Sequence, residues 1–151
     1  MTSFDNLPGG SLVLVSHGTR PVALQVIKQL LERGYRVRTT TGHFANASWL
    51  DTLFSGYAYY GMFEHVKIGC PYDSRAYMEA IKGVDAVIHS ADIPFLGPHL
   101  DEVKECAIFS IWSMFDAALS EPSVRAFVLT SPFVAAAPLA PPVDIWVDEG
   151  T

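Results

Sequence analysis

The sequence has few cysteines, little charge and no long apolar run. Its two cysteines, Cys70 and Cys106, are too few for the disulfide framework of a small secreted domain. The N-terminus lacks the basic and apolar regions of a signal peptide, and no apolar run reaches the ~20 residues of a membrane span. These absences predict a protein of a reducing compartment, most simply the cytoplasm, that does not enter the membrane.

A basic cluster is also missing. The 10 Lys and Arg residues are outnumbered by 16 Asp and Glu residues, which gives a net charge of −6. Phosphate backbones and anionic lipids attract positive surfaces, so this balance excludes nucleic acid and membrane as main partners. His43, His65 and His99 show no metal-ligand spacing with one another or with the cysteines, and we therefore predict no metal site.

The chain carries alternating strand and helix patterns. Its 151 residues, 50% of them apolar, suffice for one domain with a substantial core. Strand patterns lie just before Ser16 and at 35–41, 63–69, 84–91 and 124–131, with helical patterns from Pro21, Ala47, Ser74 and Asp101. This alternation requires a parallel sheet with right-handed crossovers. We predict an α/β fold in a single domain over 1–151, in which 132–151 form an irregular, proline-rich apolar tail.

The turn after the first strand has the layout of an anion site. Residues 16–20 (SHGTR) follow the strand, and Pro21 then opens a helix, whose N-terminus favours negative charge. Dinucleotide-binding turns have glycines spaced G-x-x-G-x-x-G or A. Counting back from Ala23, His17 and Arg20 fill the first two of these slots. Their side chains are expected to intrude on the volume that a diphosphate needs.

Four stretches of the sequence resemble a known family when they are read in order. They are LPGGSLVLVSHGTRPVALQVIKQLLERGYRVRTT, EAIKGVDAVIHSAD, EPSVRAFVLTS and IWVDE. Together they resemble the N-terminal half of an extended short-chain dehydrogenase/reductase, nearest to dihydroflavonol reductases, cinnamoyl-CoA reductases and fungal aldehyde reductases. The resemblance implies a Rossmann-like parallel sheet of order 3-2-1-4-5 with helices on both faces. It also implies a truncated chain that stops about midway through the family's usual length.

The resemblance shows where this sequence departs from the family. The family's turn reads T-G-A-T-G-F-I-A where this chain has residues 16–23, and the family's arginine after the second strand maps to Gly42, with Arg38 four residues earlier. The family's fifth strand ends T-S-S-A with a catalytic second serine, whereas Ser131 is followed here by proline. The family's proton-moving Tyr-x-x-x-Lys pair lies beyond residue 151. A family-type reductase is therefore not expected from this chain alone.

Polar side chains are expected to gather where the strands end, because open α/β sheets bind ligands in that crevice. His17, His89 and Asp92 are the acid–base candidates, and Arg20 is a charged contact for a small-molecule substrate. Imidazole titrates near neutral pH and is suited to proton transfer. We predict an enzyme without a cofactor, an isomerase, cyclase or dehydratase acting on a small biosynthetic molecule. A purely structural role for both histidines is the alternative.

Two other functions remain open. In the first, the chain is part of an NADPH-dependent reductase, and the remaining half of the reductase comes from a partner chain or is missing. Gly18, Thr19, Arg38 and Ser131 would then contact the nucleotide. The other function is that of a catalytically silent binding or regulatory module. In the longer relatives, further strands and helices cover the fifth strand, so an open apolar edge at 124–131 predicts a homodimer.

Overall fold

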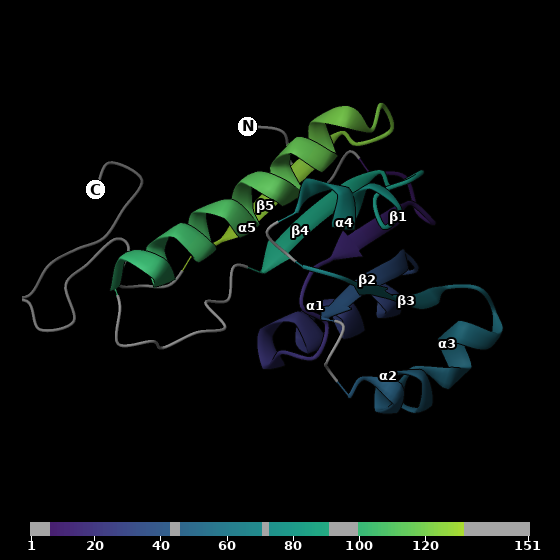
Figure 1. Ribbon diagram of the computed structural model, residues 1–151. Coiled ribbons are helices and arrows are strands. Elements are labelled where there is room, and N and C mark those ends of the chain that lie inside the picture. Colours follow the sequence, from purple (N-terminus) through teal and green to yellow (C-terminus); the bar gives the residue numbers. More distant parts are fainter. Residues whose placement is uncertain (1–6, 43–45, 71–72, 91–99, 132–151) are drawn as a thin grey trace, which may run out of the picture.

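A five-stranded parallel sheet organises the chain (Figure 1). The computed structural model describes residues 7–42, 46–70, 73–90 and 100–131. The strands are β1 (Leu12–Val15), β2 (Arg36–Gly42), β3 (Phe63–Ile68), β4 (Ala86–Ser90) and β5 (Ala126–Thr130). They lie in the order β3-β2-β1-β4-β5, and every neighbouring pair is parallel. The predicted α/β class and strand order are confirmed.

Helices cover both faces of the sheet (Figure 1). They are α1 (Pro21–Glu32), α2 (Ser48–Leu53), α3 (Ser55–Tyr59), α4 (Ser74–Met78) and α5 (Leu100–Ser120). The first three lie on one face, and α4 and α5 lie on the other. Among the described helices, none has the length and apolarity needed to cross a membrane. The predicted tail at 132–151 falls outside the described residues.

Three helix boundaries differ from the predictions. The helix expected at 47–54 stops at Leu53, and α3 starts separately at Ser55, because the backbone of Phe54 leaves the helical region at ψ 20°. The ring of Phe54 packs 4.7 Å from that of Phe63 in the core. Helix α4 ends at Met78, and the turns that follow it lead to Gly83, whose φ of 69° favours glycine. Helix α5 begins at Leu100, two residues before the start that a cap at Asp101 would give.

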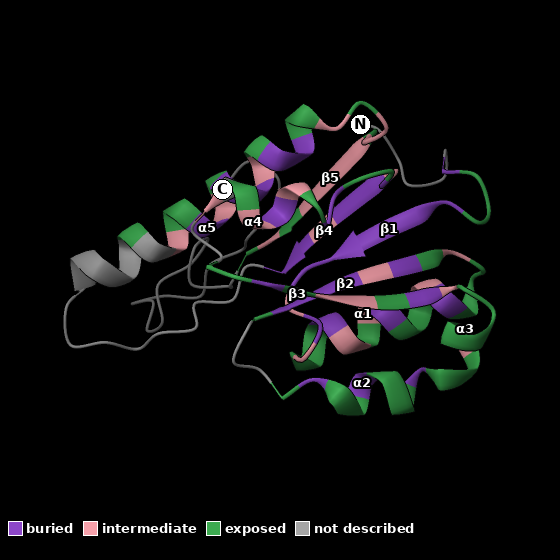
Figure 2. Cartoon of the chain, turned by 45° about the vertical axis from the view of Figure 1, so that its right-hand side comes forward, coloured by how far each residue is buried: buried purple, intermediate pink, exposed green. Residues whose placement is uncertain are grey.

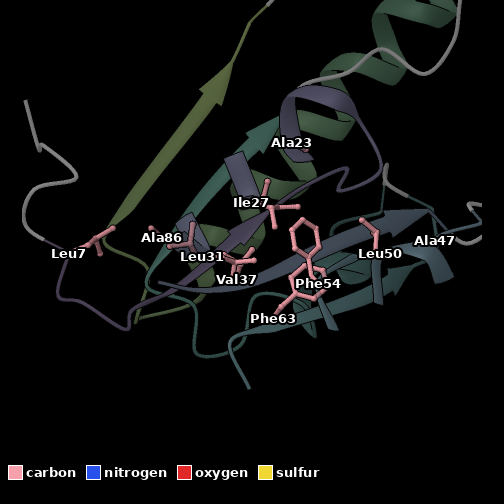
Figure 3. Close-up of a cluster of buried hydrophobic side chains, with 12 residues drawn as sticks. Leu7, Ala23, Ile27, Leu31, Val37, Ala47, Leu50, Phe54, Phe63 and Ala86 are labelled. Carbon is pink, nitrogen blue, oxygen red and sulfur yellow. The ribbon is translucent and has the colours of Figure 1, made fainter. Parts of the chain in front are cut away.

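The first core fixes α1 against the sheet (Figure 3). Ala23, Ile27 and Leu31 recur at helical spacing and are buried, and Val37 and Phe63 meet them from the strands. Each fully buried large aliphatic side chain contributes about 1.5–3 kcal/mol. Gly34 follows α1 at a φ of 82°, as its position after the helical pattern suggests. This packing holds the start of α1 beside the carboxyl end of β1.

A second core lies between the sheet and the α4–α5 layer. Leu14, Val87, Tyr77 and Met114 are among its fully buried members, so β1 is covered on both faces (Figure 2). Figure 2 also shows that burial falls off toward β5, none of whose residues is fully buried. The centre of the sheet is therefore rigidly packed where β1 and β4 lie side by side.

Candidate functional site

The candidate site lies where β1 and β4 end. These strands are neighbours in space, and the chain runs from β1 toward β2 but from β4 toward β5. Such a reversal opens a crevice at the carboxyl edge of a parallel sheet, and open α/β sheets bind ligands there. The turn at 16–20 and the start of α1 border the crevice from the β1 side.

The turn keeps a glycine-type backbone with a histidine in it. His17 has a φ of 57° and is the non-glycine residue of the described chain with a positive φ. Backbone N–H groups hold it in place, because Gly18 donates to the carbonyl of Thr40 at 2.9 Å and Arg20 donates to the carbonyl of His17 at 2.9 Å. A left-handed conformation costs a side-chain-bearing residue about 1–2 kcal/mol. The fold therefore retains the tight turn despite the missing glycine.

Gly18 brings the turn into close contact with β2. A Cβ at this position would lie 2.2 Å from Oγ1 of Thr39 and 2.8 Å from its Cγ2, distances that real carbon atoms do not tolerate. Thr39 cannot easily turn away, because its buried hydroxyl donates to the carbonyl of Val15 at 2.7 Å. Gly18 is thus required by packing between the turn and the sheet.

The N-terminus of α1 is suited to a negative ligand. Pro21 occupies the first helical position, and the side chain of the N-cap residue Arg20 makes no capping hydrogen bond. The first turn of α1 contains no acidic residue, and Arg20 is exposed. The positive end of the helix dipole and the guanidinium of Arg20 therefore belong to the same turn.

A pair of histidines lies beside this turn. The rings of His17 and His89 are 5.7 Å apart, and Nδ1 of His17 lies 3.1 Å from Oγ of Ser16. The backbone N–H of Ser90 donates to the same hydroxyl at 2.9 Å. The structure thus brings His17 and His89 together as predicted, and it adds Ser16, which the sequence pattern does not single out because serine is common in turns.

His89 is buried without a hydrogen-bond partner. Its exposed fraction is 0%, and neither ring nitrogen has a partner among the described residues. Burial, followed by the nearby charge of His17, lowers the pKa of His89 to about 4. His89 therefore stays neutral at physiological pH, and any positive charge in the pair belongs to His17.

Arg38 lies away from the site. Its Nε donates to Glu64 at 2.7 Å, and its Nη1 donates to the carbonyls of Ala80 and Lys82, each at 2.8 Å. It pairs with Leu14 in register, and these residues face the α4–α5 layer. The nucleotide contact expected for Arg38 stays a prediction; in the structure its guanidinium ties β2 to β3 and to the segment after α4.

The remaining candidates are spread around the crevice. Thr19 is half-buried in the turn, and Ser131 is exposed directly after β5. Asp92 falls outside the described residues, so its predicted place beside His89 stays a prediction. Within the described part of the chain, no group of three or more His, Cys, Asp or Glu side chains is arranged to hold a metal ion.

The described residues fit a dinucleotide diphosphate. The turn is left-handed at residue 17, and Arg20 precedes the N-terminus of α1. A tight turn that leads into a helix N-terminus is the feature that holds a pyrophosphate at the start of a Rossmann helix. The steric conflict expected from His17 is reduced, because its ring lies against His89 and Ser16.

Comparisons with known proteins place the chain in a family context. No family model matches it. It is 39% identical to "Aldehyde reductase 2" of Sporidiobolus salmonicolor, over 99% of this chain and 44% of that protein. It is 30% identical to the NAD-dependent epimerase/dehydratase terH of Aspergillus terreus, over 96% of this chain and 43% of that protein. It is 32% identical to the ketoreductase adrE of Penicillium roqueforti, over 90% and 41% of the two chains.

Solved structures show the same fold. The yeast methylglyoxal/isovaleraldehyde reductase Gre2 complexed with NADPH matches with a TM-score of 0.68 and 18% identity, over 83% of this chain and 38% of that one. The Gre2–NADPH complex from Candida albicans matches with a TM-score of 0.69 and 24% identity, again over 83% and 38%. These matches support the resemblance to the extended short-chain dehydrogenase/reductases. The chain spans less than half the length of the curated relatives reported above.

The comparisons correct one prediction. We expected a cofactor-free enzyme, on the ground that His17 and Arg20 obstruct the diphosphate. The relatives are instead reductases and epimerase/dehydratases, and two neighbours of this fold hold NADPH. The prediction of an enzyme without a cofactor is therefore wrong, and it took the position of the His17 side chain from the sequence alone. The left-handed turn carries the ring toward β4.

Proposed function

We propose that this chain forms the nucleotide-binding part of an NADPH-dependent reductase of aldehydes or ketones. The observation that carries the proposal is the β1–α1 turn, which combines a left-handed residue 17, a tightly packed Gly18 and an α1 N-terminus without a carboxylate in its first turn. Support for the chemistry comes from the aldehyde reductase and ketoreductase relatives. NADPH supplies a hydride to a carbonyl carbon when it is bound.

The chain's own residues have binding roles in this proposal. The N–H groups at the start of α1 and the guanidinium of Arg20 face the diphosphate, and Gly18 lets the turn lie flat against β2. The core residues of α1 hold the helix against the sheet. The sequence contains no Tyr-x-x-x-Lys pair. We therefore assign nucleotide binding to this chain and proton donation to the part of the reductase that it does not cover.

The decisive experiment is a calorimetric titration of the chain with NADPH and with NADH. We expect binding of one dinucleotide with a Kd in the micromolar range, about −8 kcal/mol. Arg20→Asp should weaken it by about tenfold or more, because it replaces a favourable charge at the helix N-terminus by a repulsive one. Arg33→Asp is the matched control, since Arg33 caps the other end of the same helix.

The outcomes separate cleanly. Binding that is lost in Arg20→Asp and kept in Arg33→Asp supports the proposal. Absence of binding of either dinucleotide at millimolar concentration to a folded chain would refute it. Equal affinities for the two arginine variants would place the nucleotide away from α1 and refute the assigned site.

A further inference from the structure

The histidine in the turn differs from a glycine in one chemical respect that the fold does not require. A glycine would adopt the left-handed conformation of residue 17 without strain, whereas the imidazole adds a group that titrates near neutral pH. Strain of this kind persists where the surrounding structure holds it, and it clusters at binding sites. His17 is half-buried and belongs to the turn to which the proposed function assigns the diphosphate.

The contacts of His17 suit both of its protonation states. Ser16 accepts the N–H of Ser90 with one lone pair of its hydroxyl. Its O–H can donate to Nδ1 of neutral His17, and after a rotation its second lone pair can accept Nδ1–H of the imidazolium. A change of charge on His17 therefore costs no hydrogen bond at Nδ1.

The neighbouring groups place the charge on His17. His89 of β4 is the buried ring at 5.7 Å and stays neutral, so it adds no second cation behind the turn. Arg20 before α1 is the charged residue of the turn itself, and β2 contributes the threonines Thr39 and Thr40. The segments at 43–45 and 91–99 fall outside the described residues, and the experiment below controls for them.

We propose that His17 binds the dinucleotide diphosphate as an imidazolium, so that this chain takes up a proton when the nucleotide binds. The inference rests on the proposed function, because it concerns the same site. Its proton comes from the buffer and ends on the imidazole, and no covalent bond to the nucleotide forms. An anion beside the ring favours the charged form, and by linkage the affinity falls as pH rises past neutrality.

NADH is the right probe for the linkage. Its diphosphate has no group that titrates near neutral pH, whereas the 2′-phosphate of NADPH has a pKa close to 6. Calorimetry in two buffers of different ionisation enthalpy should show uptake of roughly half to one proton per NADH at about pH 7. The Kd should weaken by about tenfold between about pH 6 and about pH 8.

Two variants isolate the imidazole. His17→Gly restores a residue suited to the turn, and His17→Asn keeps a polar side chain that tolerates a positive φ. We expect both to bind NADH with no proton uptake and with a Kd that is the same at acid and alkaline pH. A merely structural role for His17 would change the affinity equally at every pH. His43→Gln and His99→Gln are the controls for the undescribed segments, and they should keep the uptake.

The failure modes are distinct. NADH binding to the unaltered chain without proton uptake would overturn this inference and leave the proposed function standing. Uptake that persists in both His17 variants would also overturn it, since another group must then bind the proton. If neither NADH nor NADPH binds at any pH, both proposals fail together.

Discussion

The half of the sheet around β1 and β2 is covered and buried more fully than the half around β5. Around β1 and β2, helices cover the sheet and the strands are almost fully buried, with Val13, Leu14 and Val15 at 0% exposure. Around β5 no residue of the strand is fully buried, and α5 exposes large apolar side chains on its outer side. Those exposed side chains are Ile108, Phe109, Trp112 and Leu119.

The sheet face that carries α1 shows the same contrast. Helix α1 covers β1 and β2, but beside it lies an open groove of about 360 Å³ over β4 and β5. Apolar side chains line much of it, among them Leu30, Tyr35, Ile88 and Val128. The nucleotide-site candidates at 16–20 lie in the well-covered half around β1 and β2. The proposed nucleotide binding therefore depends on this half, whereas the homodimer contact is predicted at β5.

The largest expected effect comes from a pair of matched isoleucines. Ile27 in α1 is fully buried, and Ile108 in α5 is 52% exposed. Ile27→Ala should lower the free energy of unfolding by about 2–5 kcal/mol, because it leaves a cavity in a packed core. Ile108→Ala should cost less than about 0.5 kcal/mol. Urea unfolding of both variants measures the difference.

The same pair of variants can also contradict the difference in burial between the two halves of the sheet. If Ile108→Ala proves as costly as Ile27→Ala, the outer side of α5 is buried in solution and the β5 half is complete. The m-values of the two variants should be equal, so that the midpoints alone report the change in stability.

The fold could be predicted from the sequence, because a chain with this alternation of strands and helices can form only a few parallel-sheet topologies. The sequence was less informative about side-chain partners. Arg38 alternates with Val37 and Thr39 along β2 and must therefore face away from α1. That period was readable, but its partner Glu64 depends on the register between β2 and β3. The cofactor contact inferred for Arg38 from its position in the chain therefore stays a prediction, and its observed partners could not be read from the sequence.

The turn shows a second limit of sequence reasoning. A histidine in place of a glycine at position 17 suggested that the diphosphate site is blocked. The backbone conformation of His17 could not be read from the sequence. The structure holds His17 in the left-handed region, and its ring lies beside His89. Spacing alone placed both histidines near the ends of β1 and β4, but it gave neither the ring contact nor the role of Ser16.

The second prediction concerns acid stability at the boundary between the halves. His89 has a folded-state pKa of about 4, below its ordinary value of 6.5, because of burial and then of His17. Between these pH values the unfolded chain binds a proton that the folded chain does not. Stability is therefore complete above about pH 6.5 and falls by up to about 3 kcal/mol as the pH decreases to about 4.

The test compares His89→Leu with the unaltered chain by urea unfolding across this pH range. Leucine fills a similar volume without nitrogen atoms that lack partners, so its stability curve should be flatter below pH 6.5. Carboxylates contribute equally to both proteins and cancel in the difference. Identical slopes would show that His89 gains a partner in solution.

A smaller effect is expected from the contact between the turn and β2. Gly18→Ala should cost about 1–3 kcal/mol, because the new Cβ overlaps the side chain of Thr39. Thr39→Ala alone loses the hydrogen bond to Val15 and should cost about 1 kcal/mol. The double variant should cost less than the two single changes added together. Gly42→Ala is the control, since nothing lies within 4 Å of a Cβ there. If the costs of the two single changes add up in the double variant, the turn moves freely relative to β2.

The last substitution, on β5, should hardly change the stability of the protomer but should prevent formation of the predicted homodimer. The homodimer expected at the β5 edge remains a prediction, and Leu129, 43% exposed on β5, tests it. Leu129→Lys should alter unfolding of the protomer by less than about 0.5 kcal/mol but discourage pairing of the exposed edge. Sedimentation should then show a dimer for the unaltered chain and a monomer for the variant. Tyr59→Lys, at an 85% exposed site on α3, should remain dimeric. A monomeric unaltered chain at micromolar concentration would show that the β5 half is tolerated in water without a second copy.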